Sequence, residues 1–185
     1  TLEVAANAAA GDYGITVTYH PDDVYDADEE NVAFNVVNGK VTVEAVTQIT
    51  DPTFVVSETT AEAGQKQVQV TIKAVNNPGV TSIRFNIAYN DSALKLTGLS
   101  YNPVIGGTGI PLAANHASSP ATAYWADGFK DVTGDWDFVT LTFEVDANAS
   151  AGDYGITVTY HPDDVYDANE ENVEFDVVNG KITVS

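Results

Sequence analysis

The strongest constraint on how this chain can fold is an internal repeat. Residues 1–43 match residues 142–184 without a gap, at a constant offset of 141 positions. Seven pairs differ: Leu2/Phe143, Ala5/Asp146, Ala9/Ser150, Asp28/Asn169, Ala33/Glu174, Asn35/Asp176 and Val41/Ile182. Near-identity over such a length indicates duplication of a whole structural unit, and the matching segment forms the last part of that unit.

The repeat predicts the domain organisation. We interpret residues 1–43 as the C-terminal strands of an upstream copy, residues 44–52 as a linker with little apolar pattern, and residues 53–185 as one complete domain. Thr1–Val4 corresponds to the end of the apolar alternation at Phe138–Val145. The upstream copy is therefore expected to be cut inside a strand.

Residues 1–43 carry the apolar pattern of strands that belong to a larger sandwich. Segments of about 40 residues seldom bury enough surface to fold alone. We expect this segment to take the place of its twin in another copy, because exchange of identical elements is an easy route to dimers. The natural hinge is the loop at 147–152. Pairing of the segment with an open sheet edge is the alternative.

Composition excludes two classes of partner. The chain has 27 acidic and 7 basic residues and a formal net charge of −20. Nucleic acids and anionic membranes require a basic face, which seven scattered cations cannot form. We therefore expect no nucleic-acid partner and no membrane partner. The sequence has no cysteine, which excludes disulfides, zinc–thiolate sites and cysteine nucleophiles.

Hydrophobic alternation with a period of two indicates β-strands throughout the complete domain. The clearest strands are expected at residues 67–74, 81–89, 138–145 and 154–160, with others at 54–57, 94–99, 121–127 and 173–184 and a short one near 110–115. No long segment has apolar residues at helical spacing. About nine short strands separated by turn residues predict an all-β, two-sheet sandwich.

One turn signal near the end of the chain has two interpretations. Asn179-Gly180 lies between apolar residues with high β-propensity, which ordinarily indicates a two-residue hairpin. Only five residues follow this pair, too few for a strong second strand. A bend within the last strand is an equal alternative.

Several sequence runs, in order, resemble the cohesin domain of cellulosomal scaffoldins. The most specific are the corner at Tyr89–Leu99, with Asn90-Asp91-Ser92-Ala93-Leu94, and the closing run Val177-Val178-Asn179-Gly180-Lys181-Ile182-Thr183-Val184. Trp125-Ala126-Asp127 and the strand at 139–145 lie between them. The similar stretch covers nearly all of residues 53–185.

The resemblance implies a nine-stranded jelly roll that binds a dockerin module of an enzyme or of another scaffoldin, outside the cell or on its surface. Dockerins carry calcium in EF-hand-like loops, whereas a cohesin needs no cofactor and is not an enzyme. In the family, the docking surface is the flat sheet formed by the eighth, third, sixth and fifth strands.

The resemblance also implies which residues form that surface here. The third strand would contribute Ser82, Arg84 and Asn86; the sixth strand and its end Tyr124, Asp127 and Gly128; and the fifth-strand region Leu112 and Asn115. Many family members carry Asn or Asp where this chain has Ser82 and Arg84. A cation at this place would suit an acidic or hydroxyl-bearing partner helix.

Strand parity points to the same face independently of the family. In residues 81–89 the residues Ile83, Phe85, Ile87 and Tyr89 are expected to point inward, and Ser82, Arg84, Asn86 and Ala88 outward. Arginine and tyrosine are enriched among residues that dominate protein interfaces. An ordinary solvated sheet face is the alternative interpretation.

Other functions find less support in the sequence. The acids lie in turns and polar segments rather than in an apolar pocket that would raise a catalytic pKa, so a glycosidase dyad is not expected. Residues 161–171 are rich in oxygen ligands, but their spacing departs from the EF-hand loop, so we expect no metal site. A carbohydrate-binding sandwich or a structural cell-surface adhesin repeat stays open. The former needs a row of exposed aromatic rings, and Trp125 points inward by parity.

Overall fold

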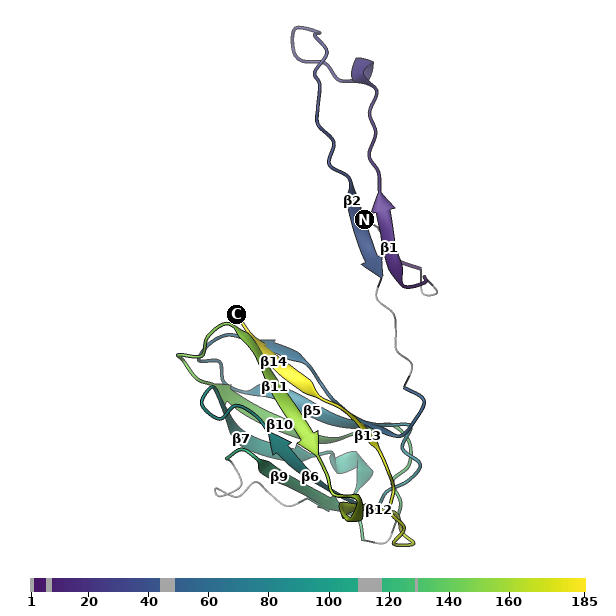
Figure 1. Ribbon diagram of the computed structural model, residues 1–185, viewed down its shortest axis with the longest axis vertical. Helices are drawn as coiled ribbons and strands as arrows, with labels where there is room; N and C mark the ends of the chain where they lie inside the picture. The colour runs from purple at the N-terminus through teal and green to yellow at the C-terminus, as the bar shows by residue number, and fades with distance from the viewer. Residues whose placement is uncertain (1, 6–7, 44–48, 110–117, 129) are drawn as a thin grey trace. The chain divides into compact units, whose positions relative to one another are not determined.

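The computed structural model describes residues 2–5, 8–43, 49–109, 118–128 and 130–185. The chain divides into two compact units, Thr1–Gln48 and Ile49–Ser185, which Figure 1 shows as a long hairpin and a β-sandwich. Of the helices in the described ranges, none has the length and apolar character of a membrane span.

The larger unit is built from two β-sheets, as predicted. One sheet, here called the back sheet, has the strand order β13-β3-β5-β10-β7. Its strands are β3 (Thr53–Val56), β5 (Val68–Val75), β7 (Leu94–Tyr101), β10 (Trp136–Val145) and β13 (Asp176–Val178). All of its pairings are antiparallel except β13 with β3, which is parallel.

The other sheet, here called the front sheet, has the order β4-β14-β11-β6-β9-β8, with β12 paired to β6. Its strands are β4 (Thr59–Ala61), β6 (Ser82–Ala88), β8 (Thr108–Gly109), β9 (Ala121–Ala126), β11 (Gly152–Thr159), β12 (Val165–Tyr166) and β14 (Gly180–Val184). Short 3₁₀ helices occupy Pro103–Ile105 (η2) and Pro162–Asp164 (η4). The expected strand near residues 110–115 lies outside the described residues.

Both the first and the last strand of the sandwich pass from one sheet to the other. β3 pairs in the back sheet and β4 in the front sheet, and β13 and β14 follow them in the same way. Asn179 stands between β13 and β14, and its Oδ1 accepts a hydrogen bond from the N–H of Val158 at 2.8 Å. The Asn179-Gly180 pair therefore makes a bend and not a hairpin. This all-β, jelly-roll sandwich is the fold class predicted from the sequence.

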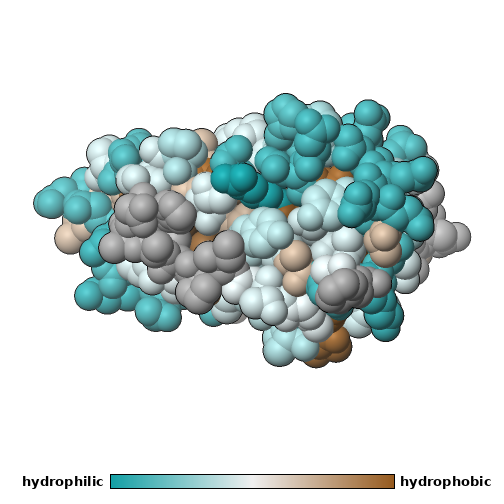
Figure 2. Space-filling view, turned by 90° about the horizontal axis from the view of Figure 1, so that it is seen from below, coloured by the Kyte–Doolittle hydropathy of each residue, from teal (hydrophilic) through white to brown (hydrophobic). Residues whose placement is uncertain are grey.

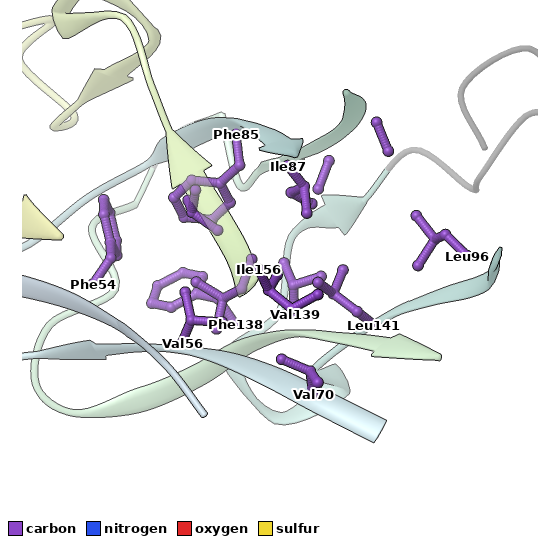
Figure 3. Packing of buried hydrophobic residues seen from close by; sticks show 14 of the residues in the cluster. Phe54, Val56, Val70, Phe85, Ile87, Leu96, Phe138, Val139, Leu141 and Ile156 are labelled. Carbon is purple, nitrogen blue, oxygen red and sulfur yellow. The ribbon is translucent and has the colours of Figure 1, made fainter. Parts of the chain in front are cut away.

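The core lies between the two sheets and consists of the residues that alternation placed inward. Figure 3 shows Phe85 and Ile87 of β6 and Ile156 of β11 facing Phe138 and Leu141 of β10. Each is essentially inaccessible to solvent, and burial of such a side chain contributes about 1.5–3 kcal/mol. Since these residues fix the inner faces of both sheets, they also fix which residues point outward.

The smaller unit contains one antiparallel pair, β1 (Gly11–Ile15) with β2 (Gly39–Val43). A short 3₁₀ helix, η1 (Pro21–Asp23), lies in the segment between them. Many apolar side chains of this unit are exposed, among them Leu2, Val17, Phe34 and Val37. The unit therefore lacks a core of its own among the described residues.

Candidate functional site

The centre of the front sheet presents a regular outer face. In the β6–β9 ladder Arg84 lies opposite Tyr124, and Asn86 lies opposite Thr122. The intervening residues, such as Ile83 and its partner Trp125, are buried. Because directly opposed residues of an antiparallel pair share one side of the sheet, Arg84, Asn86, Thr122 and Tyr124 form a continuous surface. We call it the β6–β9 face.

β11 extends this face on the other side of β6. Thr159 lies opposite Asn86, and Thr157 lies opposite Ala88. Both threonines are exposed. Thr122, Thr157 and Thr159 were not among the site residues predicted from the sequence. The alternation that buries Ile156 and Val158 was the signal that could have identified the two on β11.

Arg84 supplies the positive charge of this face. It is exposed, and it is the one basic residue in the sequences of β6, β9 and β11. The ion pairs found among the described residues do not involve Arg84. An exposed guanidinium on a protein of net charge −20 is suited to bind a carboxylate of a partner, because its planar fork can donate two parallel hydrogen bonds.

Tyr124 is held in position by Tyr101 at the end of β7. The hydroxyl of Tyr101 accepts a hydrogen bond from the N–H of Tyr124 at 3.1 Å. The ring of Tyr101 lies so close to Gly109 that a Cβ there would stand 1.9 Å from a ring carbon. Burial raises the pKa of Tyr101 above its ordinary value. Tyr101 thus contacts both β8, at Gly109, and β9, at Tyr124, along this edge of the face.

The expectation that Ser82 is exposed is wrong. Ser82 is only 1% accessible to solvent. It lies between Ala126 of β9 and Tyr166 of β12, at the end of the sheet where neighbouring segments converge. There Asp131 accepts a hydrogen bond from the N–H of Ala168 at 2.7 Å. Strand parity gives the side of the sheet correctly but does not reveal that segments outside the strand cover its end.

The remaining predicted residues lie at or beyond the end of β9. Asp127 directly follows β9, is half-buried, and donates its N–H to the carbonyl of Thr81 at 2.9 Å. Gly128 is exposed and has a φ of 86°. These two therefore border the β6–β9 face rather than lying on it. Leu112 and Asn115 lie outside the described residues, and their role stays a prediction.

The acidic segment around residues 161–171 uses its carboxylates to close turns. Oδ1 of Asp167 accepts hydrogen bonds from the N–H groups of Asn169 and Glu171 at 2.8 and 2.9 Å. The Glu171 contact contributes most to holding the pKa of Asp167 below its ordinary value. Within the described ranges, no group of three acidic, histidine or cysteine side chains is placed to hold a metal ion.

The face shown in Figure 2 is mostly hydrophilic or near neutral in hydropathy, with apolar residues in small separate patches. This agrees with a sandwich whose large apolar side chains are in the core.

The sandwich and its exposed polar face define the class of protein, and comparison with known proteins identifies the family. Residues 52–184 match the cohesin domain family. The chain therefore belongs to the cohesin family. No curated protein matches the sequence.

Solved cohesin structures share the fold. A type I cohesin of scaffoldin ScaB from Pseudobacteroides cellulosolvens has 20% identity and a TM-score of 0.58, covering 72% of this chain and 92% of its own. The cohesin–dockerin complex of OlpA from Clostridium thermocellum has 16% identity and a TM-score of 0.60, and the match covers 73% of this chain and 99% of the matched chain. A non-cellulosomal cohesin from Archaeoglobus fulgidus has 18% identity and a TM-score of 0.61, and the match covers 73% of this chain and 91% of the matched chain. At these identities the likeness establishes the fold alone.

Proposed function

We propose that this chain is a non-catalytic binding module whose β6–β9 face docks a dockerin carried by an enzyme or a scaffoldin. The observation that carries the proposal is one sheet face on which Arg84, Asn86 and Tyr124 are adjacent and accessible. The cohesin family match supports it. Several of the similar solved structures are complexes of a cohesin with a dockerin. The proposal includes an extracellular or cell-surface location and assembly of a cellulosome.

The proposed partner surface has a defined charge. A dockerin helix that places Asp or Glu opposite Arg84 would pair with the single cation of the face, whereas a basic helix would be repelled by it. Thr122, Thr157 and Thr159 around it offer hydroxyl groups that donate and accept. A standard interface of about 800 Å² on each partner would cover this face.

The alternative of a carbohydrate-binding sandwich lacks its main requirement among the described residues of this face. Trp125 is buried beneath it, with its indole N–H donated to the carbonyl of Gly106 at 2.9 Å. Tyr124 is half-buried. It is the only aromatic residue among the outward-pointing side chains of β6, of β9 and of the part of β11 that pairs with β6.

The direct test is a binding screen. The chain is titrated by calorimetry with a panel of calcium-loaded dockerins that differ in the charge of their recognition helices, and is incubated in parallel with insoluble cellulose. We expect saturable binding to at least one dockerin with an acidic helix and no retention on cellulose. Binding to cellulose with no dockerin bound would overturn the proposal.

The site itself is tested by charge reversal at Arg84. We expect Arg84→Glu to weaken dockerin affinity at least tenfold, about 1.4 kcal/mol, because it places like charges opposite each other in the interface. Lys95→Glu is the matched control, since it changes the net charge equally but lies on β7 of the back sheet. Equal losses in both variants would mean that overall charge, and not this face, governs binding.

A further inference from the structure

The smaller unit has the local structure of the end of the sandwich. The β1–β2 ladder pairs Gly11 with Val43, and the β11–β14 ladder pairs Gly152 with Val184, which are the same positions of the repeat. Side-chain hydrogen bonds recur as well. The hydroxyl of Tyr19 donates to the carbonyl of Phe34 at 2.9 Å and accepts its N–H at 2.7 Å, as Tyr160 does with Phe175.

The two copies differ in what covers their apolar side chains. Val17 is 57% exposed, whereas its counterpart Val158 is 2% exposed. Phe34 is 57% exposed, whereas Phe175 is 7% exposed. An open groove on the smaller unit is lined mainly by apolar side chains, including Leu2, Val4, Tyr13, Ile15, Val41 and Val43. The described apolar side chains of this segment thus have the local arrangement of their counterparts in the sandwich but are exposed.

The sandwich shows what such a partner looks like. Residues 152–184 pack on a body formed by residues 53–146. β11 pairs with β6, β13 with β3 and β14 with β4. Phe175 stacks on Phe54 with ring centroids 4.0 Å apart. Of the seven positions that differ in the smaller unit, only two substitute buried residues, Leu2 for Phe143 and Val41 for Ile182. Both substitutions keep an apolar side chain.

We propose that residues 11–43 are an interchangeable closing segment that docks on the 53–146 body of a second copy of this chain, in the place that residues 152–184 occupy. The hinge at 147–152 leaves β10 unbroken. Residues 1–185 contain the sequence of this body once and the sequence of the closing segment twice. Docking of residues 11–43 therefore displaces residues 152–184 of the recipient. Two chains that exchange in this way form a closed symmetric dimer.

The length of the connection favours a second copy over closure within one chain. Closure within one chain would place Val43 where its counterpart Val184 lies, beside Ala61. Ile49, at the other end of the linker, is held near the start of β3, because its carbonyl accepts a hydrogen bond from the side chain of Asn76. From Thr53 to Ala61 the first strand extends for roughly 26 Å at its ordinary rise per residue. The six Cα-to-Cα steps from Val43 to Ile49 span only about 21 Å when fully extended. A recipient body in another molecule is free of this restriction.

The test uses the full chain with its own closing segment disabled. Ile156 is fully buried, so Ile156→Asp prevents residues 152–184 from docking, while the equivalent Ile15 is left intact. We expect the I156D chain to keep its β-sandwich circular dichroism and to double its mass in analytical ultracentrifugation. The double variant I15D/I156D should lose the folded signal, and I15D alone should stay a folded monomer. A folded I156D monomer, or an I156D chain as unfolded as the double variant, would overturn the proposal.

A second measurement places the contact without relying on the stability of that variant. Thr157 lies opposite Ala88, and the counterpart of Thr157 is Thr16. Chains with T16C and chains with A88C are unfolded together, refolded and oxidised; the unmodified chain contains no cysteine. A disulfide heterodimer should form with A88C but not with K95C, which lies on the other sheet. Equal cross-linking of both, or of neither, would contradict the proposed register.

Discussion

Phe175 and Phe34 occupy equivalent positions of the repeat, although the residues directly before and after them differ. Comparing them shows how much a phenylalanine depends on the residues packed around it. Phe175 is buried and stacked on Phe54. Phe34 meets Tyr19 edge-on, with ring centroids 6.2 Å apart, and is largely open to solvent. Both phenylalanines keep the same pair of backbone hydrogen bonds with a tyrosine hydroxyl, so the main structural difference between them is burial in the core.

We predict that Phe175→Ala lowers the free energy of unfolding of the sandwich by about 3–5 kcal/mol, the usual loss for a buried phenylalanine. Phe34→Ala should change it by less than about 0.5 kcal/mol, as an exposed substitution does. Urea unfolding followed by tryptophan fluorescence measures both, because Trp125 and Trp136 lie in the sandwich. Similar losses for the two variants would contradict this assignment of the core.

At this scale the sequence predicts the side of a strand well and the depth of burial less well. Alternation correctly places Arg84 and Asn86 outward and Trp125 inward, because a strand has a strict period of two. Ser82 has the same parity as Arg84 but is buried where segments far away in the sequence converge. Such coverage depends on tertiary packing, which no local pattern records.

The turn between β13 and β14 shows how an element is fixed by its neighbours. Gly180 crosses the first strand where β3 gives way to β4. A Cβ at this position would lie 2.3 Å from the carbonyl oxygen of Ser57 and 2.7 Å from that of Val56. The same glycine in the other copy, Gly39, has nothing within 4 Å of the point that a Cβ would occupy. Close passage of two backbones explains why glycine is required at one of these places.

We predict that Gly180→Ala lowers the free energy of unfolding by about 1–3 kcal/mol, the usual cost of forcing an extra methyl group into a packed site. Gly39→Ala is the matched control and should leave the sandwich unchanged. Thermal unfolding of both variants distinguishes the two positions. An unchanged melting temperature for G180A would show that the two strands do not pass so closely.

Asp153 connects β11 to β14 and makes this pair sensitive to acid. Its carboxylate accepts hydrogen bonds from Nζ of Lys181 and Oγ1 of Thr183 at 2.8 and 2.7 Å. These contacts, led by Lys181, hold the pKa of Asp153 below its ordinary value of 3.8. Since the folded pKa is lower than the unfolded one, the carboxylate favours the folded state above about pH 4, and this contribution is lost as the pH falls further.

We therefore predict that Asp153→Asn lowers the melting temperature at pH 7 and reduces its dependence on pH between about 5 and 3. Asp137→Asn is a suitable control, because Asp137 is exposed on β10 and makes no hydrogen bond from its carboxylate to a described residue. Melting curves recorded at several pH values for the three proteins provide the measurement. An acid dependence of D153N as steep as that of the unmodified chain would refute this assignment.

At the level of elements, the sequence predicted the strands of the sandwich because each has a buried face that produces alternation. It left the Asn179-Gly180 pair undecided between hairpin and bend. That choice depends on β13 and β14 pairing with two different segments, Thr53–Val56 and Thr59–Ala61. It did not anticipate the short strands β4, β8 and β12 as separate elements, since segments of two or three residues carry no periodicity.

The whole molecule concentrates its packing in one unit. Every residue of the buried core cluster lies between Phe54 and Val184, and residues 49–52 are also fixed to the sandwich, through bonds such as that from the N–H of Asp176 to the carbonyl of Pro52. The repeat could predict that residues 1–43 resemble residues 142–184. It could not predict that the apolar side chains of residues 142–184 are buried in the core while many of those in residues 2–43 are exposed.

We predict that removal of residues 1–48 leaves the main melting transition within about 2 °C, because none of the core is lost, and leaves dockerin affinity unchanged. Removal of residues 142–185 should abolish the transition in a monomer. Differential scanning calorimetry with binding titrations tests both. A fall of more than about 5 °C on removing residues 1–48 would mean that the two units stabilise each other.

The parallel pairing of the first and last strands has a mechanical consequence. Thr53 lies beside Asp176 at one end of the sandwich, and Val184 lies beside Ala61 at the other end. The polypeptide therefore enters and leaves this domain at opposite ends of two adjacent strands. A pulling force transmitted along the backbone acts parallel to these strands, so that the hydrogen bonds between them are loaded in shear and must yield together rather than one after another.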